Sequence, residues 1–246
     1  MLLDRGKESV LNFIKPTDKV LDIGGGKGIR WKPILEKFPD LQLTFFEPDK
    51  KELELAKLQL IGPNVIFISS FHKIPDNSID LIFSFAVLEH VWAKTKYFEN
   101  VSRILKRTGT AYISYDDGHF RSYLYADRGK ILNFKNSLKT RMHLIWVLLK
   151  KYNKYQQPVN SKSLAAIIGN QNLTIKGEYF SAINFLKNME FNGKKFSPDT
   201  ADAIYDLEKQ LNLEYQDHKS SKQFEEHGPL WRIMSTRTLE IVHKTQ

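Results

Sequence analysis

A glycine-rich loop from Asp22 to Gly28 is the part of the sequence whose residue types could do chemistry. It reads Asp-Ile-Gly-Gly-Gly-Lys-Gly, follows an apolar run at 19–24 and precedes a stretch of helical pattern at 29–38. Glycines let a backbone turn tightly and approach a ligand with no Cβ in the way, and a helix N-terminus attracts polar or anionic groups. The loop therefore predicts a binding site for a polar or anionic ligand.

Two common nucleotide-binding patterns do not match this loop. The dinucleotide fingerprint G-x-G-x-x-G requires glycine where Ile29 stands, which disfavours a nicotinamide-dependent oxidoreductase. The phosphate-binding pattern G-x-x-x-x-G-K-[ST] is not matched either. The glycines alone do not identify the ligand, so the residues that follow the other apolar runs are needed to identify it.

Three further motifs follow the loop in chain order. Glu47 stands nineteen residues after Gly28, at the end of the apolar run 41–47, in the sequence FFEPD. The segment IPDNSID at 74–80 leads into LIFSFAVLEHV, and LKRTGT at 105–110 precedes the next apolar run. The order and spacing of these motifs are more specific than any one of them.

Together the motifs resemble class I S-adenosylmethionine-dependent methyltransferases, in particular the small-molecule branch with LEH after the fourth strand. The resemblance covers about residues 15–115 and implies S-adenosyl-L-methionine as the cofactor. Glu47 suits the role of the acid that binds the ribose, because one carboxylate can accept hydrogen bonds from two vicinal hydroxyls. The cofactor-binding residues that the resemblance implies are Asp22, Gly24, Gly25, Gly26, Glu47, Pro48, Ser70, Phe71 and Phe85.

Two positions depart from the pattern of the family. Ser70 stands where an acidic residue often contacts the adenine amine, and its hydroxyl could still accept that hydrogen bond. The segment LKRTGT lacks the proline and one glycine of the family's LKPGG turn. We expect the second change to alter the turn without touching the cofactor.

Methyl transfer is an in-line displacement at a sulfonium, so an enzyme mainly positions the acceptor and, for some acceptors, removes its proton. The candidate catalytic residues are His90, which follows the fourth apolar run, and Asp116 and His119, which follow the fifth. A framework role for His90 and a turn role for the other two are the alternatives. Glu89 and Asp116 offer two carboxylates with no third ligand in view, so no metal site is predicted.

The pattern of apolar runs predicts the elements that must position these residues. Runs at 19–24, 41–47, 64–69, 79–85 and 110–115 alternate with helical stretches at 29–38, 49–60 and 92–106. Continuous hydrophobicity indicates strands that are covered on both faces, as in a parallel sheet flanked by helices. Runs at 173–180 and 237–243 would complete an α/β fold with a doubly wound, mostly parallel seven-stranded sheet, the Rossmann-like methyltransferase fold, with an inserted helical cap. Ligands of such sheets bind at the carboxyl ends of the strands.

We expect one domain over residues 1–246, because no Pro/Gly/Ser-rich linker divides the chain. Its core would comprise about 15–115, 161–183 and 233–246, and insertions at about 116–160 and 184–232 would form a substrate cap. The first insertion holds an expected helix at 137–152 with an apolar centre and basic ends, and the second an expected helix at 199–211. The helix at 137–152 could lie at a membrane interface, close over an apolar acceptor, or be a buried lid, which is favoured because its apolar residues surround the helix.

Composition and charge limit the kinds of partner that the protein is expected to bind. The 246 residues contain no cysteine and carry a formal charge of +9, and no acidic residue occurs between Asp127 and Glu178. The basic block 128–176 could attract phosphates, nucleic acid or an anionic membrane, or it could be an ordinary solvated surface. Nucleic acid is disfavoured, because SFAV stands where adenine and cytosine methyltransferases carry NPPY or PC.

The sequence therefore predicts methyl transfer to an O- or N-nucleophile of a small molecule, a sugar or a lipid-linked intermediate. Peripheral contact with an anionic membrane remains open, as does the oligomeric state. The lack of a long apolar run or an apolar N-terminal segment predicts a cytoplasmic protein. The alternative is a non-catalytic adaptor that keeps the fold and binds an anionic partner through the basic insertion, but the intact glycine loop and Glu47 argue against it.

Overall fold

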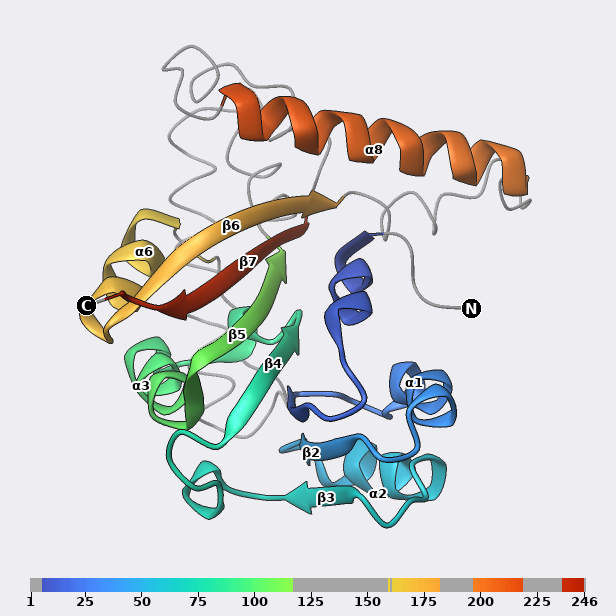
Figure 1. Cartoon of the computed structure of the whole chain (residues 1–246), viewed down its shortest axis with the longest axis vertical. Coiled ribbons are helices and arrows are strands. Elements are labelled where there is room, and N and C mark those ends of the chain that lie inside the picture. The colour runs from blue at the N-terminus through green and yellow to red at the C-terminus, as the bar shows by residue number, and fades with distance from the viewer. Residues whose placement is uncertain (1–5, 117–158, 160, 182–196, 219–235, 246) are drawn as a thin grey trace, which may run out of the picture.

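A seven-stranded sheet forms the centre of the computed structural model, which describes residues 6–116, 159, 161–181, 197–218 and 236–245. The strands follow the order β3-β2-β1-β4-β5-β7-β6 (Figure 1). The pairs among β1 to β5 are parallel, whereas β7 is antiparallel to both β5 and β6. The predicted doubly wound, mostly parallel sheet is thus confirmed.

All seven strands lie close to the apolar runs that predicted them. Their bounds are β1 Lys19–Ile23, β2 Gln42–Phe46, β3 Val65–Ile68, β4 Ile79–Phe85, β5 Leu105–Asp116, β6 Leu173–Ser181 and β7 Thr236–His243. Along β4, Ile82 packs into one hydrophobic cluster while its neighbours Leu81 and Phe83 pack into the other. Because both faces of the strand are buried, its sequence is continuously apolar rather than alternating.

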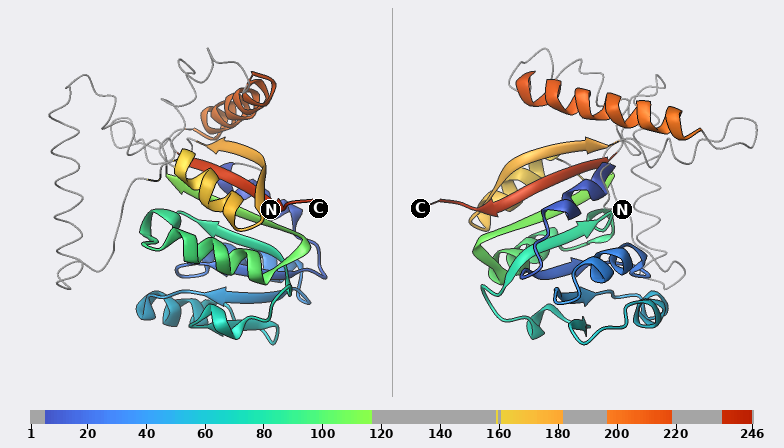
Figure 2. Two further views of the ribbon diagram at one scale, coloured as in Figure 1. Left: turned by 90° about the vertical axis from the view of Figure 1, so that its left-hand side faces the viewer. Right: turned by 45° about the vertical axis from the view of Figure 1, so that its right-hand side comes forward.

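Helices cover both faces of the sheet (Figure 2). One cluster packs against α3 (Lys94–Ile104) and α6 (Ser161–Asn170), and the other against the 3-10 helix η1 (Gly6–Phe13), α1 (Lys32–Lys37) and α2 (Lys50–Gln59). The remaining described helices are η2 (Ile29–Trp31), η3 (Phe71–Lys73), η4 (Leu88–His90) and α8 (Pro198–His218). The sequence pattern missed η1 and α6, and α8 extends beyond the predicted 199–211.

The junction between α3 and β5 differs from the expectation of a turn. The strand begins at Leu105, directly after the helix, so the segment LKRTGT is part of β5. The backbone N–H of Arg107 donates to the Asn77 side-chain oxygen at 3.0 Å, a bond that the proline of the family's turn could not make. The missing proline thus allows the strand to extend toward its N-terminal end, away from the carboxyl edge.

The strand ends that flank the two predicted insertions lie at one edge of the sheet. Asp116 at the end of β5 pairs with Thr236 at the start of β7, and Thr236 pairs with Ser181 at the end of β6. The helix α8 lies beyond these strand ends in Figure 1. Since β5 is parallel to β4, this edge is also the carboxyl edge of the parallel strands.

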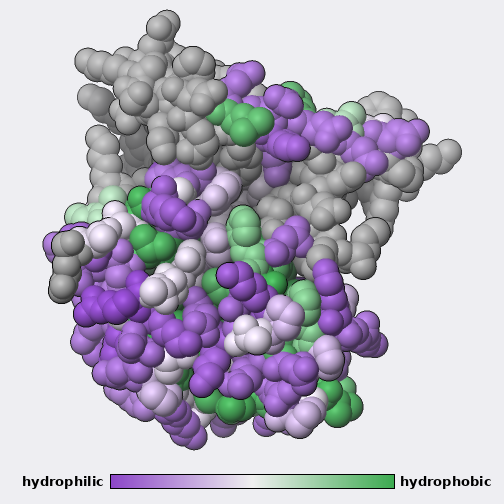
Figure 3. All heavy atoms as spheres, in the orientation of Figure 1, coloured by the Kyte–Doolittle hydropathy of each residue, from purple (hydrophilic) through white to green (hydrophobic). Residues whose placement is uncertain are grey.

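Several expectations lie outside the described residues, among them His119, the helix at 137–152 and most of the basic block. Within the described ranges, no helix is both long and apolar enough to cross a membrane. Hydrophobic side chains on the face in Figure 3 are scattered among hydrophilic ones. Exposed apolar side chains near the β3 edge include Leu58, Ile61 and Ile66.

Candidate functional site

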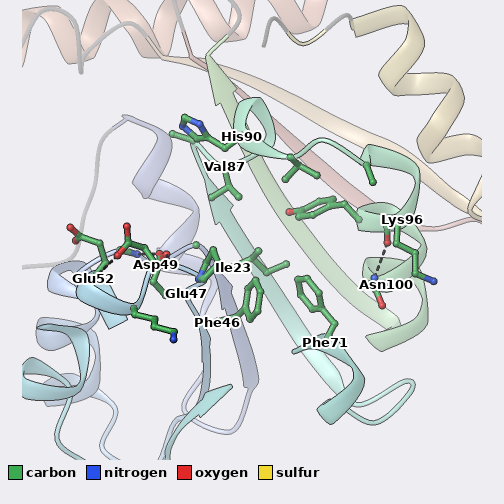
Figure 4. Close-up of a pocket in the computed structure, with 18 residues that line it drawn as sticks. Ile23, Phe46, Glu47, Asp49, Glu52, Phe71, Val87, His90, Lys96 and Asn100 are labelled. Atoms are coloured by element: carbon green, nitrogen blue, oxygen red, sulfur yellow. Dashed lines mark hydrogen bonds between the residues drawn. The ribbon is translucent and has the colours of Figure 1, made fainter. Parts of the chain in front are cut away.

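A pocket of about 910 Å³ lies at the carboxyl ends of β1, β2 and β4. Figure 4 shows Glu47, Asp49 and Glu52 on one side of it, Lys96 and Asn100 of α3 on the other, and Phe46 and Phe71 between. It is lined by Ile23, Gly24, Gly26, Phe46, Glu47, Pro48, Asp49, Lys50, Glu52, Phe71, Ala86, Val87, His90, Val91, Ala93, Lys96, Tyr97 and Asn100.

The glycine loop forms one wall of the pocket with a backbone that favours glycine. Gly24 and Gly26 have φ angles of +71° and +60°, in the left-handed region. A Cβ added to Gly24 would meet the Val87 side chain at 2.5 Å, whereas one added to Gly26 would meet no described atom within 4 Å. The backbone conformation of Gly26 therefore favours glycine, whereas no neighbouring side chain would exclude a larger residue. A side chain at this position would enter the open pocket.

The carboxylate of Glu47 is fixed at the pocket wall by two backbone donors. The N–H of Gly26 donates to Oε2 and the N–H of Asp49 donates to Oε1, each at 2.8 Å. The residue is only 8% exposed, yet it lines the pocket. Because a carboxylate has about four acceptor positions, each oxygen can still accept a further hydrogen bond from a ligand. The glycine loop and the end of β2 are thus joined through the side chain predicted to bind a diol.

Asp22 lies beneath the loop and is fully buried. The Trp31 indole N–H donates to its Oδ2 at 2.5 Å, whereas its Oδ1 has no hydrogen-bond partner among the described residues. Burial raises the pKa of Asp22, although the nearby Arg30 and the Trp31 hydrogen bond oppose this shift. A buried carboxylate with an unpaired oxygen is costly to the fold, which favours a role toward a ligand.

Two aromatic rings provide an apolar wall. Phe46 ends β2 and Phe71 begins η3, and their ring centroids lie 4.5 Å apart with planes tilted by 35°. Arg103 of α3 holds the η3 loop, because its guanidinium donates to the carbonyls of Phe71 at 2.8 Å and Ile74 at 2.9 Å. Such a wall can pack against a flat ring of a ligand.

The turn after β4 forms the wall nearest to β5. Ala86 has a φ of +56°, a strained conformation for a residue with a Cβ, and its N–H donates to the Ser114 carbonyl at 3.0 Å. Val87 and His90 follow it into the pocket lining, whereas Glu89 is 2% exposed and does not line the pocket. The strained turn therefore directs His90, a candidate acid or base, toward the pocket.

The structure brings some of the predicted site residues into the lining and leaves others outside it. Those that line the pocket are Gly24, Gly26, Glu47, Pro48, Phe71 and His90. Outside the lining are Asp22, Gly25, Ser70, Phe85 and Asp116.

Each residue outside the lining has its own position. A Cβ on Gly25 would collide with Asp22 and Phe45, so its smallness serves packing behind the loop. Ser70 caps η3 by accepting the His72 N–H at 3.3 Å, and Phe85 is buried under the Arg30 guanidinium. Asp116 ends β5 at the carboxyl edge, and His119 lies beyond the described residues.

Sequence reasoning missed the part of the lining that α3 contributes, namely Lys96, Tyr97 and Asn100. Residues three and four apart share one face of a helix, so Asn100 was predictable from either of the other two. No periodicity distinguishes a helix face that lines a pocket from one that packs on a sheet.

Asp49 also lines the pocket, and its residue type and position favour an N-cap of α2. Its side chain accepts the N–H groups of Lys51 and Glu52 at 2.9 and 3.3 Å.

Comparison with known proteins bears on the same region of the chain. Residues 21–113 match the family model described as a methyltransferase domain. This segment runs from β1 through most of β5 and contains every pocket-lining residue. A search of curated protein sequences gives no significant match.

Solved structures of methyltransferases share the fold. A methyltransferase from Haloferax volcanii in complex with its activator is 11% identical over 95% of this chain and 85% of that chain, with a TM-score of 0.57. Phosphoethanolamine N-methyltransferase 2 from Haemonchus contortus, with S-adenosyl-L-methionine, is 18% identical over 98% of this chain and 52% of that chain, with a TM-score of 0.56. Geranyl diphosphate C-methyltransferase from Streptomyces coelicolor is 10% identical over 97% and 79%, with a TM-score of 0.58.

The sheet has the Rossmann-like methyltransferase fold, and residues 21–113 match a methyltransferase domain. The methyltransferase predicted from the motifs is thereby confirmed for this segment.

Proposed function

We propose that the pocket binds S-adenosyl-L-methionine and that the protein transfers its methyl group to an O- or N-nucleophile of a small molecule, a sugar or a lipid-linked intermediate. The observation that carries this proposal is Glu47, whose carboxylate is held by the Gly26 and Asp49 N–H groups at the wall of the pocket. A carboxylate fixed in this way is suited to accept hydrogen bonds from two hydroxyls of one ribose.

The residues present fit this cofactor in three respects. The space in front of Gly26 is open, so the backbone can approach a ligand there. The Oδ1 atom of Asp22 is an unpaired acceptor for an ammonium group, directly or through water. The acidic side chains Glu47, Asp49 and Glu52 outnumber Lys50 on one side of the pocket, and the net negative charge there favours a ligand that carries positive charge (Figure 4).

The chain itself supplies binding, orientation and proton handling. When bound, S-adenosyl-L-methionine supplies a methyl group on a positively charged sulfur, which is an electrophile. Glu47 would hold the ribose, the backbone at Gly24 and Gly26 the methionyl part, and Phe46 with Phe71 the adenine. His90 lines the same pocket and can take a proton from the acceptor through a ring nitrogen. Asp116 and His119 are further candidates for contact with the acceptor.

We assign the acceptor side to the edge from which the two insertions leave. The paired residues Asp116, Ser181 and Thr236 mark this edge, which β4 and the pocket share. Insertions at 116–160 and 184–232 that start here are suited to cover an acceptor as a cap.

Two experiments test the proposal. Calorimetric titration with S-adenosylhomocysteine should show binding at a single site, and titration with NAD should show none; binding of NAD alone would refute the proposal. A radiolabelled-methyl screen against phenols, alcohols, amines, carboxylates, sugars and lipid-linked sugars then identifies the acceptor. Label on one class that is lost in His90→Gln, with S-adenosylhomocysteine affinity kept, would support the role of His90, whereas cofactor binding without transfer to any acceptor would favour the adaptor.

A further inference from the structure

Asn100 of α3 lines the pocket, but it has no part in the function proposed above. Its side chain is buried, and its Nδ2 donates to the Lys96 carbonyl one turn earlier at 2.8 Å. This bond fixes the orientation of the amide group, because an oxygen in the place of Nδ2 would face another oxygen. The Oδ1 atom is therefore turned away from Lys96 (Figure 4), and it accepts no hydrogen bond from the described residues.

Asn100 lies beside the aromatic wall of the pocket. Arg103, three residues later on the same face of α3, donates to the Phe71 carbonyl at 2.8 Å, so this part of the helix lies against η3. Of the other two lining residues of α3, Lys96 can only donate hydrogen bonds, and the Tyr97 hydroxyl is fully buried. The Oδ1 atom of Asn100 is thus the acceptor that α3 presents to the pocket next to Phe71.

The shape of a nucleoside decides which of its atoms would approach this acceptor. Glu47, suited to a ribose, and α3 lie on opposite sides of the pocket, with the rings of Phe46 and Phe71 between them (Figure 4). A purine that lies on these rings with its ribose at Glu47 directs the far edge of its six-membered ring toward α3. In adenine this edge carries the 6-amino group, which donates hydrogen bonds, whereas a 6-oxopurine carries an oxygen there.

We propose that Oδ1 of Asn100 accepts a hydrogen bond from the 6-amino group of the cofactor's adenine and so distinguishes adenine from a 6-oxopurine. This inference rests on the proposed function. Ser70, which the sequence suggested for this contact, lies outside the lining, and its hydroxyl oxygen accepts the His72 N–H as the cap of η3. The acceptor for the amino group thus comes from α3 in place of the loop after β3.

Replacement of Asn100 by leucine and by aspartate separates recognition from structure. We would measure the Kd of each variant for S-adenosylhomocysteine and for S-inosylhomocysteine, which carries oxygen in place of the amino group. The wild type should prefer the adenosyl ligand, and Asn100→Leu should lower this preference about 2- to 12-fold, as for one lost hydrogen bond. Asn100→Asp keeps an acceptor but cannot donate to the Lys96 carbonyl, so it should keep the preference even if its Tm falls.

Asn64→Leu is the matched control. Asn64 lies outside the lining, and its Nδ2 also donates to a backbone carbonyl, that of Pro39, at 3.2 Å. The substitution makes the same chemical change away from the pocket, so this variant should bind both ligands as the wild type does.

Each contrary result has a separate meaning. An unchanged preference in Asn100→Leu, or equal binding of both ligands by the wild type, would overturn the inference but leave the proposed function standing. Equal loss of preference in Asn100→Leu and Asn100→Asp would assign Asn100 a purely structural role and overturn the inference as well. A loss of preference in Ser70→Ala but not in Asn100→Leu would return the contact to the loop after β3. If the wild type does not bind S-adenosylhomocysteine, the proposed function fails, and this inference fails with it.

Discussion

Replacing Glu47 by alanine removes the carboxylate that joins the glycine loop to the end of β2. In the wild type each oxygen accepts one backbone N–H at 2.8 Å, from Gly26 and from Asp49. The variant would lose the acceptors that we propose for two ribose hydroxyls and also the contact that fixes the loop. Charge-assisted hydrogen bonds contribute about 1.5–3 kcal/mol each, and water at the pocket wall will compensate in part. We expect a loss of about 2–4 kcal/mol, roughly 30- to 700-fold in Kd.

Calorimetric titration with S-adenosylhomocysteine measures this loss directly. Glu54→Ala is the control, since Glu54 lies on α2 with its side chain 68% exposed and pairs only with Lys57 among the described residues. It changes the net charge by the same amount as Glu47→Ala but removes no pocket residue, so its affinity should stay within about twofold of the wild type. Equal affinities of the two variants, with circular dichroism showing intact folds, would refute the role of Glu47.

Three other substitutions have distinct expected outcomes. Gly26→Val should abolish S-adenosylhomocysteine binding by calorimetry, because its side chain enters the open pocket and a φ of +60° strains a β-branched residue; normal occupancy would contradict the loop assignment. Asp22→Asn should raise Tm at pH 7 but weaken binding; since burial raises the pKa of Asp22, the Tm difference should shrink as pH falls toward 3.8. Burial lowers the pKa of Lys94 from 10.5 to about 8. As the pH rises between these two values, the free energy of unfolding of the wild type should therefore increase relative to that of Lys94→Met. A difference that stays constant with pH in urea titrations would contradict this.

The sequence by itself determined the sheet and the edge of the sheet at which the pocket lies. Runs such as IDLIFSF at 79–85 are apolar at successive positions because β4 is buried on both faces, and this local pattern predicts a strand of a covered parallel sheet. Glycines at 24 and 26 and the acid at 47 follow such runs directly, so their position at the carboxyl edge was predictable too. The helix η1 was missed because its buried apolar residues, Val10 and Leu11, give too short a pattern to be recognised.

Only the tertiary structure decided which side chains reach the pocket. Phe85 and Gly25 neighbour lining residues in sequence, yet the alternation of a strand and the turn of a loop direct them into the core or behind the loop. Tyr97 reaches the pocket from α3, some fifty residues after Glu47 in the chain, because the helix packs across the sheet beside β4. Local sequence sets the conformation of each element, whereas the side chains that meet in a cavity depend on packing between elements distant in sequence, which no local pattern encodes.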